Sequence, residues 1–220
     1  MNHRVAIVDY GLGNLFSVKH ACGHVGLAAE ITSDRKEIMG ADAVILPGVG
    51  AYGDAMDALR RLDLVQPLRD LAGEGRPLVG ICLGMQLVMS GSDEFGWHEG
   101  LGLVRGQVVR FEHPEEKGRE LKVPQVGWNH IRRTGPAWEG TLLDGLSDGV
   151  NMYFVHSFHV KPEEDVAVCL SRYGQIEFCS GLRKDGVWAF QFHPERSGAE
   201  GLKIYRNLAR WLSERKQGIS

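Results

Sequence analysis

The 220-residue sequence predicts an α/β fold: a mostly parallel central sheet flanked by helices on both faces, with additional antiparallel strands in the C-terminal half. In the first half, short apolar runs alternate with segments of helical periodicity. Uninterrupted apolar strands are typical of parallel sheets that are covered on both sides. In the second half, strand-like segments follow one another with turn signals between them, which favours antiparallel pairing.

The first half is expected to run strand, helix, strand, strand, helix, helix, strand. The expected strands are Arg4–Asp9, Ala29–Thr32, Ala43–Leu46 and Leu78–Ile81, and the expected helices are Asn14–Val25, Ala51–Leu59 and Leu64–Leu71. The strand runs are short and apolar, whereas the helical segments carry apolar residues at spacings of three and four.

The second half is expected to be rich in strands and to end in a helix. The expected strands are Leu101–Phe111, Val126–Arg132, Tyr153–Val160, Val166–Ser171, Ile176–Leu182 and Val187–Phe192. Lys184-Asp185-Gly186 predicts a hairpin turn between the last two, and Gly198–Glu214 is an amphipathic helix. No repeat or low-complexity linker divides the chain, so a single domain over residues 1–220 is expected.

Composition excludes several classes of protein. A hydrophobic content of 43% and a charged content of 24% are ordinary for a soluble globular protein. The net charge of −3, without a long basic run, argues against nucleic acid or an anionic membrane as partner. The four cysteines are not needed as disulfides in a chain of this size, and no apolar segment is long enough to span a bilayer. A cytoplasmic location is expected.

Gly80-Ile81-Cys82-Leu83-Gly84 is the most informative motif, because it has the pattern of a nucleophile elbow with sulfur in place of oxygen. A sharp strand-to-helix turn holds its corner residue in a strained backbone conformation, and the flanking glycines permit close packing. A thiol at the start of a helix is favoured as thiolate. The simpler interpretation is a buried cysteine that packs under a helix.

A nucleophilic cysteine requires a base, and the base requires an orienting group. His193-Pro194-Glu195 supplies both, since residues two apart on an extended strand point to the same side. His193 is therefore the expected base, with Glu195 fixing its tautomer. Taken alone, the pair would more often be a core histidine and a solvent-facing glutamate.

Pro47-Gly48-Val49-Gly50 follows a predicted strand and completes the catalytic hypothesis. Acyl transfer to a thiolate creates an oxyanion, which backbone N–H groups must stabilise. The amides of Val49 and Gly50 in this loop, together with that of Leu83 in the elbow, are the expected donors. The alternative is an ordinary turn between strand and helix.

These three motifs resemble those of the glutaminase domains of triad (class I) glutamine amidotransferases. Residues 9–15 (Asp-Tyr-Gly-Leu-Gly-Asn-Leu), 124–129 (Pro-Gln-Val-Gly-Trp-Asn) and 153–159 (Tyr-Phe-Val-His-Ser-Phe-His) narrow the resemblance. With them, essentially the whole chain is similar to the glutaminase subunits of imidazole glycerol phosphate synthases, which belong to histidine biosynthesis.

The resemblance implies a function. Glutamine would be hydrolysed through a thioester on Cys82, without metal or cofactor, and ammonia would pass to a (β/α)₈-barrel cyclase subunit in a heterodimer. By position in the motifs, glutamine would be bound by Gly48, Gly50, Gln86, Glu94, Ser157 and Phe158. The interface with the cyclase would include Asn14, Trp128, Tyr153 and Arg196.

Three alternatives stay open beside this function: the glutaminase subunit of another synthase, a stand-alone γ-glutamyl hydrolase or peptidase, and a non-catalytic regulatory subunit. The intact Cys82, His193 and Glu195 disfavour the last of these.

Two further signals are weaker. Gly11-Leu12-Gly13 has the start of a dinucleotide-binding fingerprint, but Phe16 occupies the third glycine position. His156 and His159 could suggest a metal site, yet residues three apart on one strand point to opposite faces. We therefore expect His156 to pack near the site and His159 to lie at the surface.

Overall fold

The computed structural model describes residues 3–135 and 137–216. The helices are α1 (Leu15–His24), α2 (Arg35–Gly40), α3 (Tyr52–Arg61), α4 (Val65–Gly73), α5 (Leu83–Leu87) and α6 (Gly198–Lys216), with a 3₁₀ turn at Pro194–Arg196. The strands of the first half are β1 (Arg4–Val8), β2 (Ala28–Thr32), β3 (Ala43–Gly48), β4 (Leu78–Cys82), β5 (Met89–Ser92), β6 (His98–Glu99) and β7 (Val104–Arg110). Those of the second half are β8 (Glu115–Glu116), β9 (Arg119–Glu120), β10 (Gln125–Arg133), β11 (Val150–His156), β12 (Phe158–Pro162), β13 (Ala167–Tyr173), β14 (Ile176–Lys184) and β15 (Val187–Phe190).

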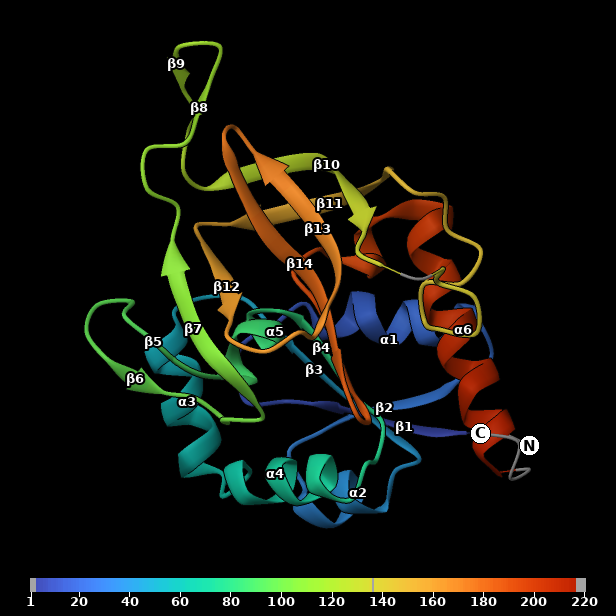
Figure 1. Cartoon of the computed structure of the whole chain (residues 1–220). Coiled ribbons are helices and arrows are strands. Elements are labelled where there is room, and N and C mark those ends of the chain that lie inside the picture. The colour runs from blue at the N-terminus through green and yellow to red at the C-terminus, as the bar shows by residue number, and fades with distance from the viewer. Residues whose placement is uncertain (1–2, 136, 217–220) are drawn as a thin grey trace.

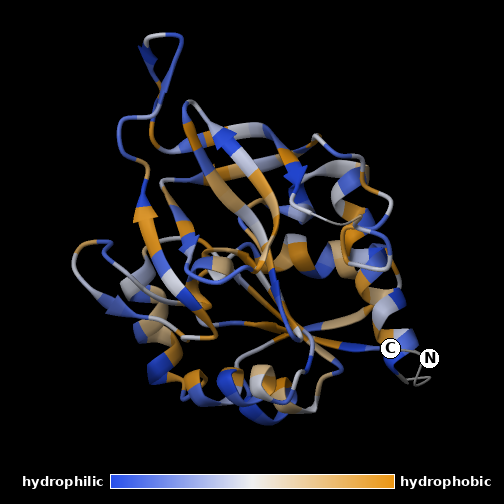
Figure 2. Cartoon of the chain, viewed as in Figure 1, coloured by the Kyte–Doolittle hydropathy of each residue, from blue (hydrophilic) through white to orange (hydrophobic). Residues whose placement is uncertain are grey.

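The predicted α/β fold with a mostly parallel core is confirmed. Five neighbouring strands, in the order β2-β1-β3-β4-β15, are all parallel. Alternate residues along β1 enter two separate cores: Val5 and Ile7 pack with residues of α1 and α6, whereas Ala6 and Val8 pack with residues of α2, α3 and α4. Helices therefore cover both faces, as Figure 1 shows, and the central strands are hydrophobic along their length (Figure 2).

The predicted antiparallel strands extend the sheet beyond β15. β14 pairs with β15, β13 and β12, and β12 pairs with β7, in each case antiparallel. The hairpin predicted at Lys184-Asp185-Gly186 is present: Lys184 pairs with Val187, and Asp185 has φ +52°, as a two-residue primed turn requires. The short β8–β9 hairpin projects from the body of the molecule (Figure 1).

The structure differs from the expected elements at several places. The single strand expected over Tyr153–Val160 is two strands, β11 and β12, which are separated at Ser157. The strand expected to reach Phe192 ends at Phe190. Helix α2 was missed, although Asp34 caps it by accepting hydrogen bonds from the N–H groups of Lys36 and Glu37.

The sheet order brings the predicted motifs together. β4 lies between β3 and β15, and Gly48 at the end of β3 pairs with Cys82 at the end of β4. The carboxyl ends of parallel strands meet at one edge, where α/β proteins bind their ligands. Three segments far apart in sequence thus converge there. No helix within the described residues is long and apolar enough to cross a membrane.

Candidate active site

Cys82 has the backbone geometry of an elbow. Its φ and ψ are +55° and −109°, outside the regions that a non-glycine residue ordinarily adopts, and it immediately precedes α5. The flanking glycines make this turn possible. A Cβ on Gly80 would lie 2.8 Å from the carbonyl oxygen of Gly84, and a Cβ on Gly84 would collide with the backbone oxygen of Leu46.

His193 and Glu195 form the predicted contact, but by a different route from the one expected. Nδ1 of His193 lies 2.8 Å from Oε1 of Glu195, and both side chains are almost completely buried. Neither residue is on a strand, because β15 ends at Phe190 and Glu195 lies in the 3₁₀ turn that starts at Pro194. The tight turn, and not strand alternation, directs both side chains to the same side.

The charge environment of His193 favours its protonated form. Burial alone lowers the pKa of the imidazole, but the nearby Cys82 side chain and the Glu195 carboxylate outweigh this effect and raise it to about 10. Nε2 of His193 is buried and has no hydrogen-bond partner among the described residues. This nitrogen is therefore available for proton exchange with the cysteine and its reactants.

Sequence reasoning missed Ser197, which fixes the backbone of His193. Its hydroxyl donates to the carbonyl of His193 at 2.7 Å and accepts from the N–H of Tyr153 at 3.0 Å. The N–H of His193 in turn donates to the carbonyl of Tyr153 at 2.9 Å. A serine directly before a helix is an ordinary capping signal, so the residue type alone does not indicate this bridge.

A cavity of about 240 Å³ adjoins Cys82 and collects most of the predicted substrate and oxyanion residues. It is lined by Val49, Gly50, Cys82, Leu83, Gln86, Glu94, Pro124, Val155, His156, Ser157 and Phe158. Leu83 is the first residue of α5, so its N–H has no partner within the helix and is suited to an oxyanion.

Gly48 does not line this cavity, but it adjoins the elbow. A Cβ at Gly48 would collide with the hydroxyl of Tyr10 and lie 2.9 Å from Cβ of Leu83. The Tyr10 hydroxyl donates to the carbonyl of Pro47 at 2.7 Å, and this hydrogen bond connects the segment that follows β1 with the start of the Pro47–Gly50 loop.

The two predicted side-chain ligands are already engaged by the protein. One carboxylate oxygen of Glu94, Oε2, accepts from the N–H of Tyr52 at 2.7 Å, which leaves its other oxygen for a ligand. Gln86 donates from Nε2 to the carbonyl of Phe158 at 3.0 Å and to Oε1 of Gln191 at 3.1 Å. Both interactions hold these side chains in one orientation.

His156 lines the cavity as a neutral ring, whereas the expectation for His159 was wrong. Burial lowers the pKa of His156 to about 3, and its Nδ1 donates to the carbonyl of Phe158 at 2.7 Å. His159 is not at the surface: it is only 8% exposed and packs against Phe111 and Phe178. The break at Ser157 changes the direction of the chain, so strand alternation does not extend from His156 to His159.

Three of the four predicted interface residues form a cluster next to His193. The rings of Trp128 and Tyr153 meet edge to face at 6.1 Å, and the Arg196 guanidinium lies 4.3 Å from the centre of the Tyr153 ring. Tyr153 also lies beside His193, at 6.5 Å between ring centres. Asn14, the fourth, directly precedes α1 and its side chain makes no capping hydrogen bond there.

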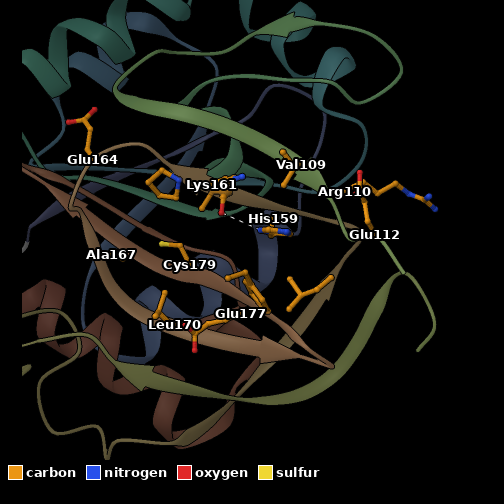
Figure 3. A pocket seen from close by; sticks show the side chains of 14 residues that line it. Val109, Arg110, Glu112, His159, Lys161, Glu164, Ala167, Leu170, Glu177 and Cys179 are labelled. Carbon is orange, nitrogen blue, oxygen red and sulfur yellow. Dashed lines mark hydrogen bonds between the residues drawn. The ribbon is translucent and has the colours of Figure 1, made fainter. Parts of the chain in front are cut away.

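A second cavity, of about 560 Å³, lies between β7, β12, β13 and β14 (Figure 3). Its walls carry side chains of both charges, including Arg110, Lys161, Glu112 and Glu177, around apolar groups such as Leu170. None of the predicted site residues lines it. The predicted substrate and oxyanion residues instead gather at the smaller cavity at the end of β4.

Known proteins resemble this chain over nearly its full length. The family model described as glutamine amidotransferase class-I matches residues 6–210. The protein named imidazole glycerol phosphate synthase subunit HisH from Geobacter metallireducens is 46% identical over 209 residues, which are 93% of this chain and 97% of that protein. The HisH subunit of Desulfitobacterium hafniense is 43% identical, over 96% of this chain and 95% of its own.

Solved structures agree at the level of the fold. The structure described as PurLQS from Thermotoga maritima has a TM-score of 0.72 at 20% identity and covers 96% of this chain and 100% of its own. A glutamine amidotransferase structure has a TM-score of 0.70 at 19% identity, over 95% and 98%. The chain therefore belongs to the class I glutamine amidotransferase family.

Proposed function

We propose that this protein is the glutaminase subunit of an imidazole glycerol phosphate synthase, which hydrolyses glutamine and delivers the ammonia to a cyclase subunit. The observation that carries the proposal is the strained Cys82 beside a cavity, with His193 bonded to Glu195 at the end of the adjacent strand. The similarity to HisH subunits over more than nine-tenths of the chain supports the choice of substrate and partner.

In the first half of the reaction, the Cys82 thiolate attacks the side-chain carbonyl carbon of glutamine. The resulting oxyanion is stabilised by the N–H of Leu83 and by N–H groups of the Val49–Gly50 loop. His193 donates a proton from Nε2 to the departing nitrogen, the carbon–nitrogen bond breaks, and ammonia leaves. A γ-glutamyl thioester remains on Cys82.

In the second half, water attacks the thioester carbonyl while the neutral His193 accepts a proton from it. The carbon–sulfur bond breaks, glutamate leaves, and Cys82 is again a thiolate beside a protonated imidazole. Glu195 holds Nδ1 of His193 protonated in both halves. The raised pKa of His193 favours this resting ion pair.

The cavity suits an amino acid with a charged head group. The carboxylate of Glu94 can meet the ammonium of glutamine, and backbone N–H groups near Gly50 and Phe158 can meet its carboxylate. The cavity of about 240 Å³ has room for little beyond one small molecule. We propose on this basis that glutamine is bound by Gln86, Glu94, Gly50, Ser157 and Phe158, which line the cavity, and by Gly48, which lies close to Gly50 in the chain.

An exposed apolar surface supports a protein partner. Val126 and Trp128 lie two apart on β10, so they share a face, and each is 60% exposed. Tyr153 and Arg196 connect this surface to His193. Ammonia is protonated near neutral pH and then lost as a nucleophile, so a closed path into a partner is chemically useful. We propose that this partner is a (β/α)₈-barrel cyclase, with Asn14 also at the contact.

The decisive experiment measures glutamine hydrolysis by the full chain alone and after addition of a cyclase subunit with its ligand. Low turnover alone and a large increase with the partner are expected. Cys82→Ala is the matched control, since it should bind the cyclase without hydrolysing glutamine. High activity on γ-glutamyl peptides without a partner would instead identify a stand-alone hydrolase. Activation by the partner subunit of a different synthase would show that glutamine is hydrolysed as proposed but that the ammonia serves another synthase.

The buried cysteines are free rather than paired, which fits a reducing cytoplasm as the working location.

A further inference from the structure

Gln191 has no task in the proposed triad or oxyanion site, yet its side chain connects two residues that line the substrate cavity, Cys82 and Gln86. Its side chain is completely buried. Nε2 donates to Sγ of Cys82 at 3.7 Å, and Oε1 accepts from Nε2 of Gln86 at 3.1 Å. The backbone N–H of Gln191 donates to the carbonyl of Ser180 at 3.0 Å, which fixes its position just after β15.

The direction of this chain of hydrogen bonds follows from one backbone carbonyl. The oxygen of Phe158 can only accept, so Gln86 must turn its NH₂ group towards it. The second N–H of that group then requires an acceptor, and Gln191 supplies Oε1. Its own NH₂ group is thereby directed at the sulfur. These hydrogen bonds thus determine which way the side-chain amides of Gln86 and Gln191 point.

The hydrogen bonds that run from Cys82 through Gln191 to Gln86 affect the sulfur at one end and the substrate cavity at the other. At the sulfur, the N–H donor of Gln191 stabilises the thiolate, whereas the carbonyl of Val155, 3.8 Å from Sγ, can only accept from the thiol. At the cavity, both N–H groups of Gln86 are occupied, so Gln86 presents its carbonyl oxygen to a ligand. That oxygen can accept from the ammonium or amide N–H groups of glutamine.

We propose that Gln191 is a positioning residue that stabilises the Cys82 thiolate directly and fixes Gln86 as a hydrogen-bond acceptor for the substrate. Its effect on turnover rests on the proposed glutaminase function, but its effect on the cysteine does not. Connected hydrogen bonds between buried groups polarise one another. Loss of Gln86 should therefore also weaken the stabilisation of the thiolate, although the hydrogen bonds of Gln86 go to Phe158 and Gln191 and not to Cys82.

The test measures how fast iodoacetamide alkylates Cys82 in the full chain as pH is varied, with peptide mapping to identify the modified cysteine. Gln191→Met removes the donor and keeps the length of the side chain. It should move the pH midpoint of alkylation upward by about one unit, as expected for a lost hydrogen bond to a charged group. Gln86→Met should move it in the same direction by less, and the double variant no further than Gln191→Met alone.

Other titratable groups near the sulfur stay in place in these variants. They are His193, Tyr10 and His156, together with Glu94 at the cavity wall. Asn207→Leu is the matched control, because Asn207 is another buried amide, which donates to the carbonyls of Leu142 and Asp144 far from Cys82. It should lower stability and leave the midpoint unchanged. Gln191→Leu serves as a second apolar replacement if the methionine is poorly accommodated.

An unchanged midpoint in a folded Gln191→Met or Gln191→Leu variant would overturn the proposal, and so would an equal shift in Asn207→Leu. In the presence of the cyclase, kcat/KM for glutamine should fall about tenfold or more in Gln191→Met, with KM raised as well as kcat lowered. If the unaltered protein hydrolyses no glutamine with any partner, the proposed function fails, whereas the alkylation result still decides the role of Gln191.

Discussion

Nδ1 of His193 lies 2.8 Å from Oε1 of Glu195 across a single proline, and less than 3% of either side chain is exposed. The contact depends on a 3₁₀ turn that begins at Pro194, whose ring fixes φ and suits the first position of a helical turn. A buried carboxylate held against the imidazole in this way keeps Nε2 directed at the elbow.

Replacement of Cys82 by alanine should abolish glutamine hydrolysis while thermal unfolding and binding to the cyclase are retained. Cys82→Ser should also be nearly inactive, because a hydroxyl is much harder to ionise than a thiol. A glutamine-analogue electrophile should label Cys82 and spare the others, since burial raises the pKa of Cys22 and Cys169 to about 12 and that of Cys179 further. Peptide mapping checks this selectivity, and label on another cysteine would contradict the assignment.

His193 should titrate well above an ordinary histidine. Its pKa in the folded protein is about 10, against about 6.5 for an unperturbed side chain. Because the folded value is raised, protonation of His193 stabilises the fold fully below pH 6.5, and this contribution is lost as pH rises through 10. NMR of labelled histidine should show the ring still charged at about pH 8.

The same titration separates the causes of the shift. Burial lowers the pKa of His193, and Cys82 raises it more than Glu195 does. Cys82→Ala should therefore lower the midpoint of the His193 titration more than Glu195→Gln does. The reverse order, or a midpoint near 6.5 in the unaltered protein, would be inconsistent with a resting thiolate–imidazolium pair.

Gly48→Ala should impair both stability and activity. The added methyl group collides with the hydroxyl of Tyr10 and with Cβ of Leu83, so the oxyanion loop or β1 must move. Overpacking of this kind costs roughly 1–3 kcal/mol, measurable by urea unfolding. Tyr10→Phe removes the colliding hydroxyl, and combining it with Gly48→Ala should recover part of the stability. No recovery would mean that the contact with Leu83 dominates.

Ser197→Ala should weaken catalysis through His193. It removes the hydroxyl that connects the His193 carbonyl with the Tyr153 N–H, and a lost buried hydrogen bond costs about 1–3 kcal/mol. We expect a lower kcat at similar KM, and a weaker response to the cyclase because Tyr153 is freed as well. Ser213→Ala, in the helix that directly follows Ser197, is the control and should leave kcat unchanged, because this hydroxyl bonds only the Ala209 carbonyl and Nε2 of His3 among the described residues. Equal effects of both substitutions would indicate general loosening of α6.

Much of the fold follows from local pattern. The apolar runs at Arg4–Asp9, Ala43–Leu46 and Leu78–Ile81 predicted the strands β1, β3 and β4, and the turn signal at Lys184-Asp185-Gly186 predicted the hairpin between β14 and β15. What local pattern could not supply was the break at Ser157, because the residues on both sides of it have equal strand propensity. The misplaced His159 is a direct consequence of that missed break.

In the candidate site, too, local sequence pattern predicts some features and tertiary packing decides the others. The sequence by itself determined the chemistry: Cys82 in its glycine-flanked elbow, His193 with Glu195, and the Pro47–Gly50 loop are local motifs whose residue types and spacing limit what they can do. Only the tertiary structure decided how they meet. The order β3-β4-β15 places their strand ends side by side, and the turn at Pro194 aligns base and carboxylate. The contacts of Gln191 with Cys82 and of Ser197 with Tyr153 are visible only in the folded structure. A hydrogen bond between residues more than 40 positions apart depends on packing and leaves no local pattern in the sequence.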